Sequence, residues 1–346
     1  MAYTTINKST DHFNTKLYTG TGSSNAITGV GFQPDFTWIK ITSEANNHEL
    51  YDAVRGVTKR IYSDQNSAED TNSYGLTAFG TDGFTVSTGN AVNKSSGSFA
   101  SFNWKANGAG SSNSDGDITA TVSANTTSGF SIVKYTGNGS SGATVGHGLG
   151  SDVKMVMCKG LGDTYGWKVF HTNLTSGKTL VLNTNAAEDT DANRIASANA
   201  STFTTSGTYS VNESGSDYVA YCFAEKKGFS KFGSYTGNGN ANGAFIYTGF
   251  KPAFIIIKRI DATENWVMEN NKSRTYNPSY DFLLADSSSN PSPGAADNYQ
   301  KLDILSNGFK SRTTSVYSNA SGGTYIYMAF AEAPLVGTNN VPATAR

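Results

Sequence analysis

The sequence predicts an all-β protein made of three tandem antiparallel β-sandwich units of the jelly-roll kind. Short runs carry Val, Ile, Phe, Tyr or Thr at alternate positions and end at Gly, Asn, Asp or Ser, which is the pattern of strands. Helical periodicity is nearly missing, and we expect at most one helical turn, between residues 187 and 195. An internal repeat of about 100 residues gives each unit enough chain for one two-sheet core.

The repeat begins with a five-residue phrase, Tyr-Thr-Gly-x-Gly, that occurs three times. A glycine-led strand follows each copy, at residues 31–40, 148–159 and 249–259. We expect the tyrosine to end a strand and the two glycines to permit positive φ in the tight turn that follows. The phrase is therefore predicted to be a structural turn formed by Tyr18, Gly20, Gly22, Tyr135, Gly137, Gly139, Tyr235, Gly237 and Gly239.

Further landmarks recur in the same order and set the boundaries of the units. Residues 67–71 match residues 186–190, and a turn followed by an aromatic strand recurs at 82–84, 206–209 and 307–309. The Gly/Ser/Asn-rich stretch that begins at Asn107 is predicted to be a linker. The predicted organisation is an N-terminal arm (1–12), unit 1 (13–108), a linker (109–128), unit 2 (129–228), unit 3 (229–334) and a C-terminal tail (335–346).

Each unit closes with an aromatic-rich alternating strand, at residues 98–106, 217–225 and 324–332. Large side chains share one parity in these strands, so we expect them to line a core face. They are Phe102, Trp104, Tyr221, Phe223, Met328 and Phe330. Units 2 and 3 are joined by only a few residues, and they are therefore expected to pack against each other.

Composition excludes several classes of protein. The chain has 346 residues, a net charge of −1 and 12% aromatic residues, which suits a folded protein rather than a disordered one. The tightest basic cluster, Lys226, Lys227 and Lys231, is too short to be a footprint for nucleic acid. Residues 1–13 lack the pattern of a secretory signal, and the longest apolar runs are of strand length, so we expect a soluble protein without membrane insertion.

Candidate reactive residues form no recognisable site. Cys158 and Cys222 are expected to be buried free thiols, with a disulfide between them as the alternative. The four histidines are isolated, and the acidic pairs 69–70, 115–117 and 188–189 are too incomplete to specify Ca²⁺, so no metal or cofactor is predicted.

Two further motifs could belong to a binding or catalytic site, but a structural interpretation explains each of them better. Gly137–Gly142 has the spacing of a dinucleotide fingerprint, but no helix can follow it, which leaves a hairpin turn. The carboxylate pairs Glu49/Asp52 and Glu264/Glu269 do not recur between units and lack the strand pattern of jelly-roll glucanases, so no enzyme is predicted.

At its repeated landmarks the sequence resembles virion and tail-fibre-like proteins of marine bacteriophages, whose repeated unit is similar to a concanavalin-A-like (laminin-G-like) jelly roll. The resemblance runs through residues 13–22, 27–40, 52–59, 128–139, 145–150, 231–239, 324–334 and 341–346. It implies a bacteriophage structural protein that is made in the host cytoplasm and released in the virion by lysis. The function that follows is a tail fibre or tail-associated adhesin, whose lectin-like domains contact the host surface. The resemblance supplies no catalytic or ligand-binding residues.

Two alternatives remain at the level of sequence. One is a capsid decoration or tail-fitting protein that contacts only its neighbours, and the other is a carbohydrate-binding module. The expected partners are other virion proteins, further copies of the chain, with a trimer plausible for a fibre, and a host glycan or envelope protein. Because sugar rings stack on flat side chains, Trp266, Tyr276 and Tyr280 are the candidate glycan-stacking residues.

Overall fold

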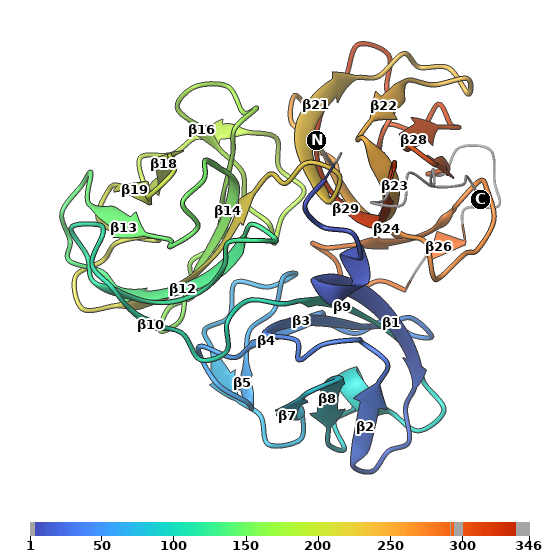
Figure 1. The fold of residues 1–346 in the computed structure, drawn as a ribbon. Helices are drawn as coiled ribbons and strands as arrows, with labels where there is room; N and C mark the ends of the chain where they lie inside the picture. The colour runs from blue at the N-terminus through green and yellow to red at the C-terminus, as the bar shows by residue number, and fades with distance from the viewer. Residues whose placement is uncertain (1–3, 291, 294–299, 337–346) are drawn as a thin grey trace.

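The computed structural model describes residues 4–290, 292–293 and 300–336, and it is built almost wholly of antiparallel strands. Three lobes surround a common centre, each formed by one unit (Figure 1). Among the described residues, helix is limited to the 3-10 turn η1 (Ser9–Asp11) and the single turn α1 (Asn90–Asn93). The predicted all-β sandwich fold is thereby confirmed.

Unit 1 is a sandwich of a four-stranded sheet in the order β1-β9-β3-β4 and a three-stranded sheet in the order β2-β8-β7, with the short pair β5-β6 beside them. Its strands are β1 (Phe13–Thr19), β2 (Asn25–Thr28), β3 (Phe36–Ile41), β4 (Glu49–Asp52), β5 (Lys59–Arg60), β6 (Asp70–Thr71), β7 (Leu76–Gly80), β8 (Gly83–Val86) and β9 (Ser98–Trp104).

Unit 2 repeats this plan, with the large sheet in the order β10-β11-β12-β20-β14-β15 and the small sheet in the order β13-β19-β18. A further short pair joins β16 to β17. Its strands are β10 (Ser111–Asn113), β11 (Ala120–Asn125), β12 (Phe130–Thr136), β13 (Thr144–Gly146), β14 (Val153–Gly160), β15 (Lys168–His171), β16 (Lys178–Thr179), β17 (Asp189–Thr190), β18 (Arg194–Ala198), β19 (Thr202–Ser206) and β20 (Asp217–Ala224).

Unit 3 has a large sheet in the order β21-β29-β23-β24-β25-β26 and a small sheet in the order β22-β28-β27. Its strands are β21 (Ser230–Thr236), β22 (Phe245–Tyr247), β23 (Phe250–Arg259), β24 (Val267–Asn270), β25 (Asp281–Leu284), β26 (Ser292–Pro293), β27 (Leu302–Leu305), β28 (Gly308–Ser311) and β29 (Thr324–Pro334). The strands β1, β12 and β21 are therefore equivalent, as are β2, β13 and β22, and so on to the closing strands.

Three details differ from the sequence-based expectation. The stretch predicted to be a linker holds β10 and β11, and β11 pairs with β12 along its whole length, so it belongs to unit 2. No helical turn forms at 187–195, where the chain instead enters β17 and β18. Tyr209 lies in a loop, because Phe203 of β19 takes the place that Phe84 and Phe309 hold in the other units.

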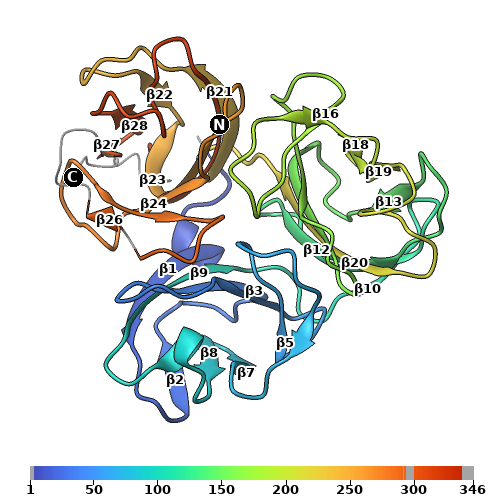
Figure 2. The same ribbon diagram turned by 180° about the vertical axis from the view of Figure 1, so that it is seen from behind.

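Each large sheet is buried on both faces. One face carries residues such as Phe99 or Tyr218 into the core of its own sandwich, and the other carries Trp104 or Phe223 into a central core that the units share. The predicted core-facing parity of the closing strands is confirmed, but the side chains pack between the units. Figure 2 shows the three lobes from the opposite side, arranged around this centre.

Three equivalent rings meet at this centre. Trp104, Phe223 and Phe330 occupy the same position in β9, β20 and β29, and their ring centroids lie 5.6 to 6.3 Å apart. Phe36 of unit 1 also stacks on Tyr221 of unit 2, with 4.2 Å between centroids. The buried Ile6 of the N-terminal arm joins the same core, so the arm is part of the body from residue 4 onward. Apart from Leu335 and Val336, the predicted C-terminal tail lies outside the described residues.

The units close into a ring through contacts that repeat from one junction to the next. The indole N–H of Trp167 donates to the Tyr62 carbonyl of unit 1 (2.7 Å), and that of Trp266 donates to the Val181 carbonyl of unit 2 (3.2 Å). In unit 1 the equivalent residue is His48, which faces the backbone of unit 3. The third junction therefore joins unit 3 back to unit 1 without a covalent connection between them.

A buried lysine lies near the end of the same strand in every unit, and those of units 1 and 3 donate across these junctions. Lys40, Lys159 and Lys258 are completely buried at the ends of β3, β14 and β23. The ammonium of Lys40 donates to the carbonyls of Asn46 (2.8 Å) and of Ser288 in unit 3 (3.2 Å). Because burial disfavours the charged form, the pKa of Lys40 and that of Lys258 both fall to about 8.

Candidate functional site

The repeated Tyr-Thr-Gly-x-Gly phrase forms the same turn in all three units. The second glycine has positive φ each time, at 72°, 73° and 64° for Gly22, Gly139 and Gly239. The first glycine is required for a different reason than predicted. It lacks positive φ, but a Cβ at Gly20 would lie 2.1 Å from a carbonyl oxygen, so only glycine permits this close approach. Gly137 and Gly237 meet carbonyl oxygens at 2.3 Å in the same way.

The tyrosine of the phrase fastens the turn to the segment before the closing strand. The hydroxyls of Tyr18, Tyr135 and Tyr235 donate to the carbonyls of Val92 (2.6 Å), Val211 (2.6 Å) and Ser318 (2.8 Å). Burial raises the pKa of all three tyrosines, so each hydroxyl keeps the proton that it donates. The tyrosine and the two glycines of each phrase, nine residues in all, therefore have a structural role in the turn.

Sequence reasoning missed the asparagine that completes this turn. Asn93, Asn212 and Asn319 are fully buried, and each lies five residues before its closing strand. The side-chain oxygen of Asn212 accepts from the Asn138 amide (2.9 Å), and its NH₂ donates to the Ser140 carbonyl (2.7 Å). Their constant spacing from the closing strand is the signal that would have revealed them.

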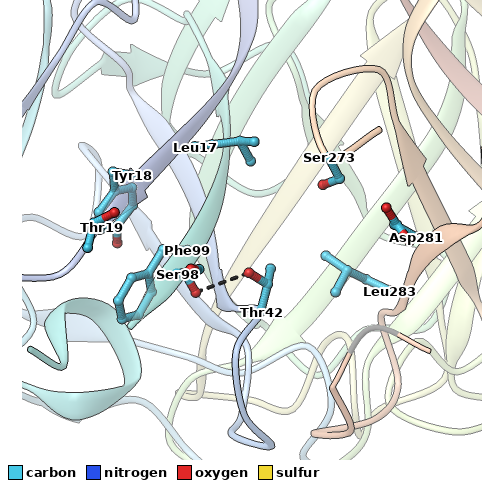
Figure 3. Close-up of a pocket in the computed structure, with 9 residues that line it drawn as sticks. All are labelled: Leu17, Tyr18, Thr19, Thr42, Ser98, Phe99, Ser273, Asp281 and Leu283. Carbon is cyan, nitrogen blue, oxygen red and sulfur yellow. Dashed lines mark hydrogen bonds between the residues drawn. The ribbon is translucent and has the colours of Figure 1, made fainter. Parts of the chain in front are cut away.

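A cleft of about 410 Å³ opens between units 1 and 3. Figure 3 shows its two walls, with β1 and β9 of unit 1 on one side and the β24–β25 region of unit 3 on the other. The lining mixes apolar and hydroxyl side chains with one carboxylate, and Leu17 keeps 40% of its surface exposed. The lining residues are Leu17, Tyr18, Thr19, Thr42, Ser98, Phe99, Ser273, Asp281 and Leu283.

The unit 3 wall of this cleft comes from a lengthened loop. The β24–β25 connection has ten residues (271–280), whereas the equivalent connections in units 1 and 2 have six each (53–58 and 172–177). Arg274 of this loop ion-pairs with the cleft residue Asp281 (3.3 Å) and packs on the rings of Tyr280 (3.3 Å to the centroid) and Tyr276 (4.6 Å). The structure thus brings two of the three candidate stacking residues together around Arg274, on the loop that forms this wall, with Tyr276 60% exposed.

The third candidate, Trp266, does not belong to this site. Only 1% of its surface is exposed, and its indole is the hydrogen-bond donor that joins units 2 and 3. Because both ring faces are buried, Trp266 offers no surface to a sugar, and the hypothesis that it stacks on a glycan is corrected. Trp167 directly precedes the equivalent strand β15 of unit 2 and also donates a hydrogen bond to another unit. The two tryptophans are therefore junction residues.

The interface between units 1 and 2 is filled by a buried charge network. The Arg55 guanidinium contacts the Asp52 carboxylate (2.5 Å) and that of Glu69 (3.1 Å), and the Tyr221 hydroxyl donates to Asp52 (2.8 Å). The paired carboxylates hold the pKa of Arg55 above its usual value. Asp52, which the sequence paired with Glu49, is therefore engaged within this interface.

The interface between units 2 and 3 holds a buried histidine. The Nε2 of His171 lies 3.3 Å from the Tyr327 carbonyl of unit 3, and burial lowers the pKa of His171 to about 4. His171 is therefore neutral near pH 7.

The remaining candidates are buried or isolated within the part of the chain that the structure describes. Cys158 and Cys222 are free buried thiols, and burial raises the pKa of Cys158 to about 12. No cluster of His, Cys, Asp and Glu suited to a metal ion is found in residues 4–290, 292–293 and 300–336. Over the same residues no helix has the length and hydropathy needed to cross a membrane.

A family model described as a domain of unknown function, DUF7483, matches residues 8–334. The chain belongs to this family. No curated protein and no solved structure matches the chain. The match covers all three units and every junction, which agrees with a ring that shares one central core.

Proposed function

We propose that this chain is a virion surface protein of a bacteriophage, a tail fibre or tail-associated adhesin that binds a host-surface glycan in the cleft between units 1 and 3. The lengthened β24–β25 loop carries this proposal. It is longer than both of its equivalents, and it contributes Ser273 to the cleft. It also carries Tyr276 and Tyr280, whose rings pack on Arg274, the ion-pair partner of the lining residue Asp281.

The chemistry of the cleft suits a pyranose ring. Leu17 and Leu283 offer apolar surface for a sugar face, and Tyr276 adds an exposed flat side chain on the same loop as the lining residue Ser273. Asp281 and Ser273 supply an acceptor and a hydroxyl for sugar hydroxyls. A site of this size that combines apolar side chains with hydroxyl groups and one carboxylate suits small-ligand recognition.

Glycan-array binding and adsorption to host cells by the full chain test this function. We expect Tyr276→Ala and Tyr280→Ala to weaken both at least about tenfold, since aromatic anchors dominate such contacts. Tyr74→Ala is the matched control, because Tyr74 is 64% exposed on unit 1, away from the cleft. Equal binding by all three variants would contradict the cleft, and a position inside the capsid lumen of the particle would contradict the adhesin.

A capsid decoration or tail-fitting role is the second candidate. The closed ring with its shared apolar core and the low charge of the surface favour it, because a rigid, weakly charged body suits permanent contact with neighbours. Absence of binding in both assays, combined with normal incorporation into virions, would support this alternative. A free carbohydrate-binding module would bind glycans but be missing from purified particles.

A further inference from the structure

We propose that unit 3 carries a second saccharide-binding surface, where a cavity at the junction of units 2 and 3 adjoins the exposed rings of Phe245 and Tyr247. The ligand is an acidic oligosaccharide. This inference rests on the proposed function for the general class of ligand, but it concerns a different face of unit 3.

The cavity has a volume of about 330 Å³ and lies beside the short segment that connects β20 to β21. Its far wall is the end of β22, so Tyr247 forms part of the lining. The residues that line it are Glu225, Lys227, Gly228, Ser230, Lys231, Tyr247, Thr248 and Gly249.

Two aromatic rings continue this cavity along β22. Phe245 and Tyr247 are 47% and 53% exposed, whereas Ile246 between them is buried in the core. Side chains two positions apart on a strand project from the same face, roughly 7 Å apart. Two neighbouring sugar rings of one oligosaccharide can therefore each lie on one aromatic ring.

The fold itself does not require these rings. The equivalent positions hold Ala26 and Thr28 in β2, and Thr144 and Gly146 in β13. Those strands form the same edge of the same three-stranded sheet with small side chains. An exposed aromatic pair found in only one of three homologous strands therefore points to a role outside the fold.

The charges of the cavity select the kind of saccharide. The lining carries two ammonium groups, Lys227 and Lys231, against the single carboxylate of Glu225. Lys231 pairs with Glu225 (2.7 Å) and is 37% exposed, and its ammonium has further N–H groups for a ligand. An acidic sugar stacked on Tyr247 places its carboxylate near these lysines, and its hydroxyls near Glu225 and Thr248.

Isothermal titration of the full chain with hexamannuronate, and with hexa-N-acetylglucosamine as the neutral probe, tests the inference. We expect the acidic probe to bind more tightly, and its affinity to fall at least about tenfold in Tyr247→Thr and Phe245→Ala. Both variants carry the residue that unit 1 uses at that position, which preserves the strand. Tyr209→Thr is the matched control, because Tyr209 is also 53% exposed but lies on unit 2.

The outcomes separate this surface from the cleft. Wild-type affinity in both β22 variants, or equal binding of the neutral probe, overturns the inference. Loss of hexamannuronate binding in Tyr276→Ala alone also overturns it, because the ligand then occupies the cleft. A wild-type protein that binds host cells through the cleft but ignores hexamannuronate overturns this surface and leaves the proposed function standing. Thermal unfolding of every variant distinguishes lost binding from lost folding.

Discussion

Units 2 and 3 share the order of four central strands, β12-β20-β14-β15 and β21-β29-β23-β24, but they close the open side of their sandwiches in different ways. In unit 2, β11 pairs with β12, and Ile118 bridges to Val145 of the small sheet. Within the described residues, the equivalent strand β21 pairs only with β29. In unit 2, Val133 of β12 pairs with β11, which covers this edge of the sheet. Unit 3 has Gly233 at the equivalent position of β21, two residues after Lys231.

The difference shows how one scaffold manages an exposed sheet edge. A covering segment lets unit 2 carry an apolar residue there, because Ile118 and Val122 complete the core between its sheets. Without such a cover, a lysine or glycine near the edge discourages pairing with another chain. The aromatic residues peculiar to unit 3 lie elsewhere, in β22 of the small sheet and in the β24–β25 loop toward the opposite edge of the large sheet.

Removing the cover of unit 2 gives the largest effect on stability. We expect Ile118→Ala to lower the free energy of unfolding by about 2–4 kcal/mol, since it empties a site in the sandwich core. Chemical denaturation measures this change, with Leu17→Ala on the exposed edge of unit 1 as the control. If the two variants lose equal stability, residues 109–125 are a linker and the contrast between the units fails.

The buried asparagines are expected to matter equally in both units, because they lie away from the edge that differs. Asn212→Ala and Asn319→Ala should each cost about 1–3 kcal/mol, since each removes several hydrogen bonds between the asparagine side chain and the backbone of the turn. The measurement is again denaturant unfolding. A cost confined to one unit would show that the repeated turn has lost its role in the other.

Units 2 and 3 have different buried polar residues at one equivalent position, and only the residue of unit 2 should make the stability depend on pH. His171 of unit 2 corresponds to Asn270 of unit 3. The folded pKa of His171 is about 4, below its unfolded value of 6.5, so the unfolded chain binds more protons between these values. The stability that neutral His171 supports is therefore present above pH 6.5 and is lost as the pH falls toward 4.

His171→Asn should remove this dependence. The difference in unfolding free energy between wild type and variant should change by about 1–3 kcal/mol from pH 6.5 to pH 4. Comparing the two proteins matters because Asp64 and Asp286, whose pKa values are raised to about 6 by burial, contribute the opposite slope. A pH-independent difference would mean that His171 titrates normally in the folded protein.

Tyr276→Ala is expected to have the smallest effect on stability. Its exposed ring contributes less than about 0.5 kcal/mol to folding, as is usual for surface positions, while binding at the cleft is lost. Thermal unfolding and glycan binding measured on one preparation would test both. A large drop in stability would contradict this expectation and would show that Tyr276 stabilises the fold through its contact with Arg274.

The repeat pattern predicted the strands and units, but it did not predict the ring. Alternation assigned one buried face to each large sheet, yet β3 is buried at all six positions from Phe36 to Ile41. Near-continuous apolar runs of this kind are typical of strands buried on both faces, and they were the signal for the central core. Which units share that core depends on contacts between distant residues, such as Phe36 and Tyr221, that no local pattern contains.

Errors in the predicted site and linker have equally specific causes. Trp266 was predicted to bind because a flat side chain can stack on a sugar ring, and only comparison with Trp167 would have marked it as structural. Residues 109–128 were assigned to a linker because their glycines and serines outweigh the alternation around Val122. The cleft could not be predicted, because its walls come from units that are far apart in sequence.

Hydrogen–deuterium exchange of the full chain, with and without a bacterial surface polysaccharide, tests the central proposal that unit 3 is the binding unit of a rigid ring. The account predicts slower exchange at residues 245–249 and 271–283, with the equivalent segments of unit 2, 144–148 and 172–180, unchanged. Equal protection of both units, or bound polysaccharide with no protection in unit 3, would contradict it.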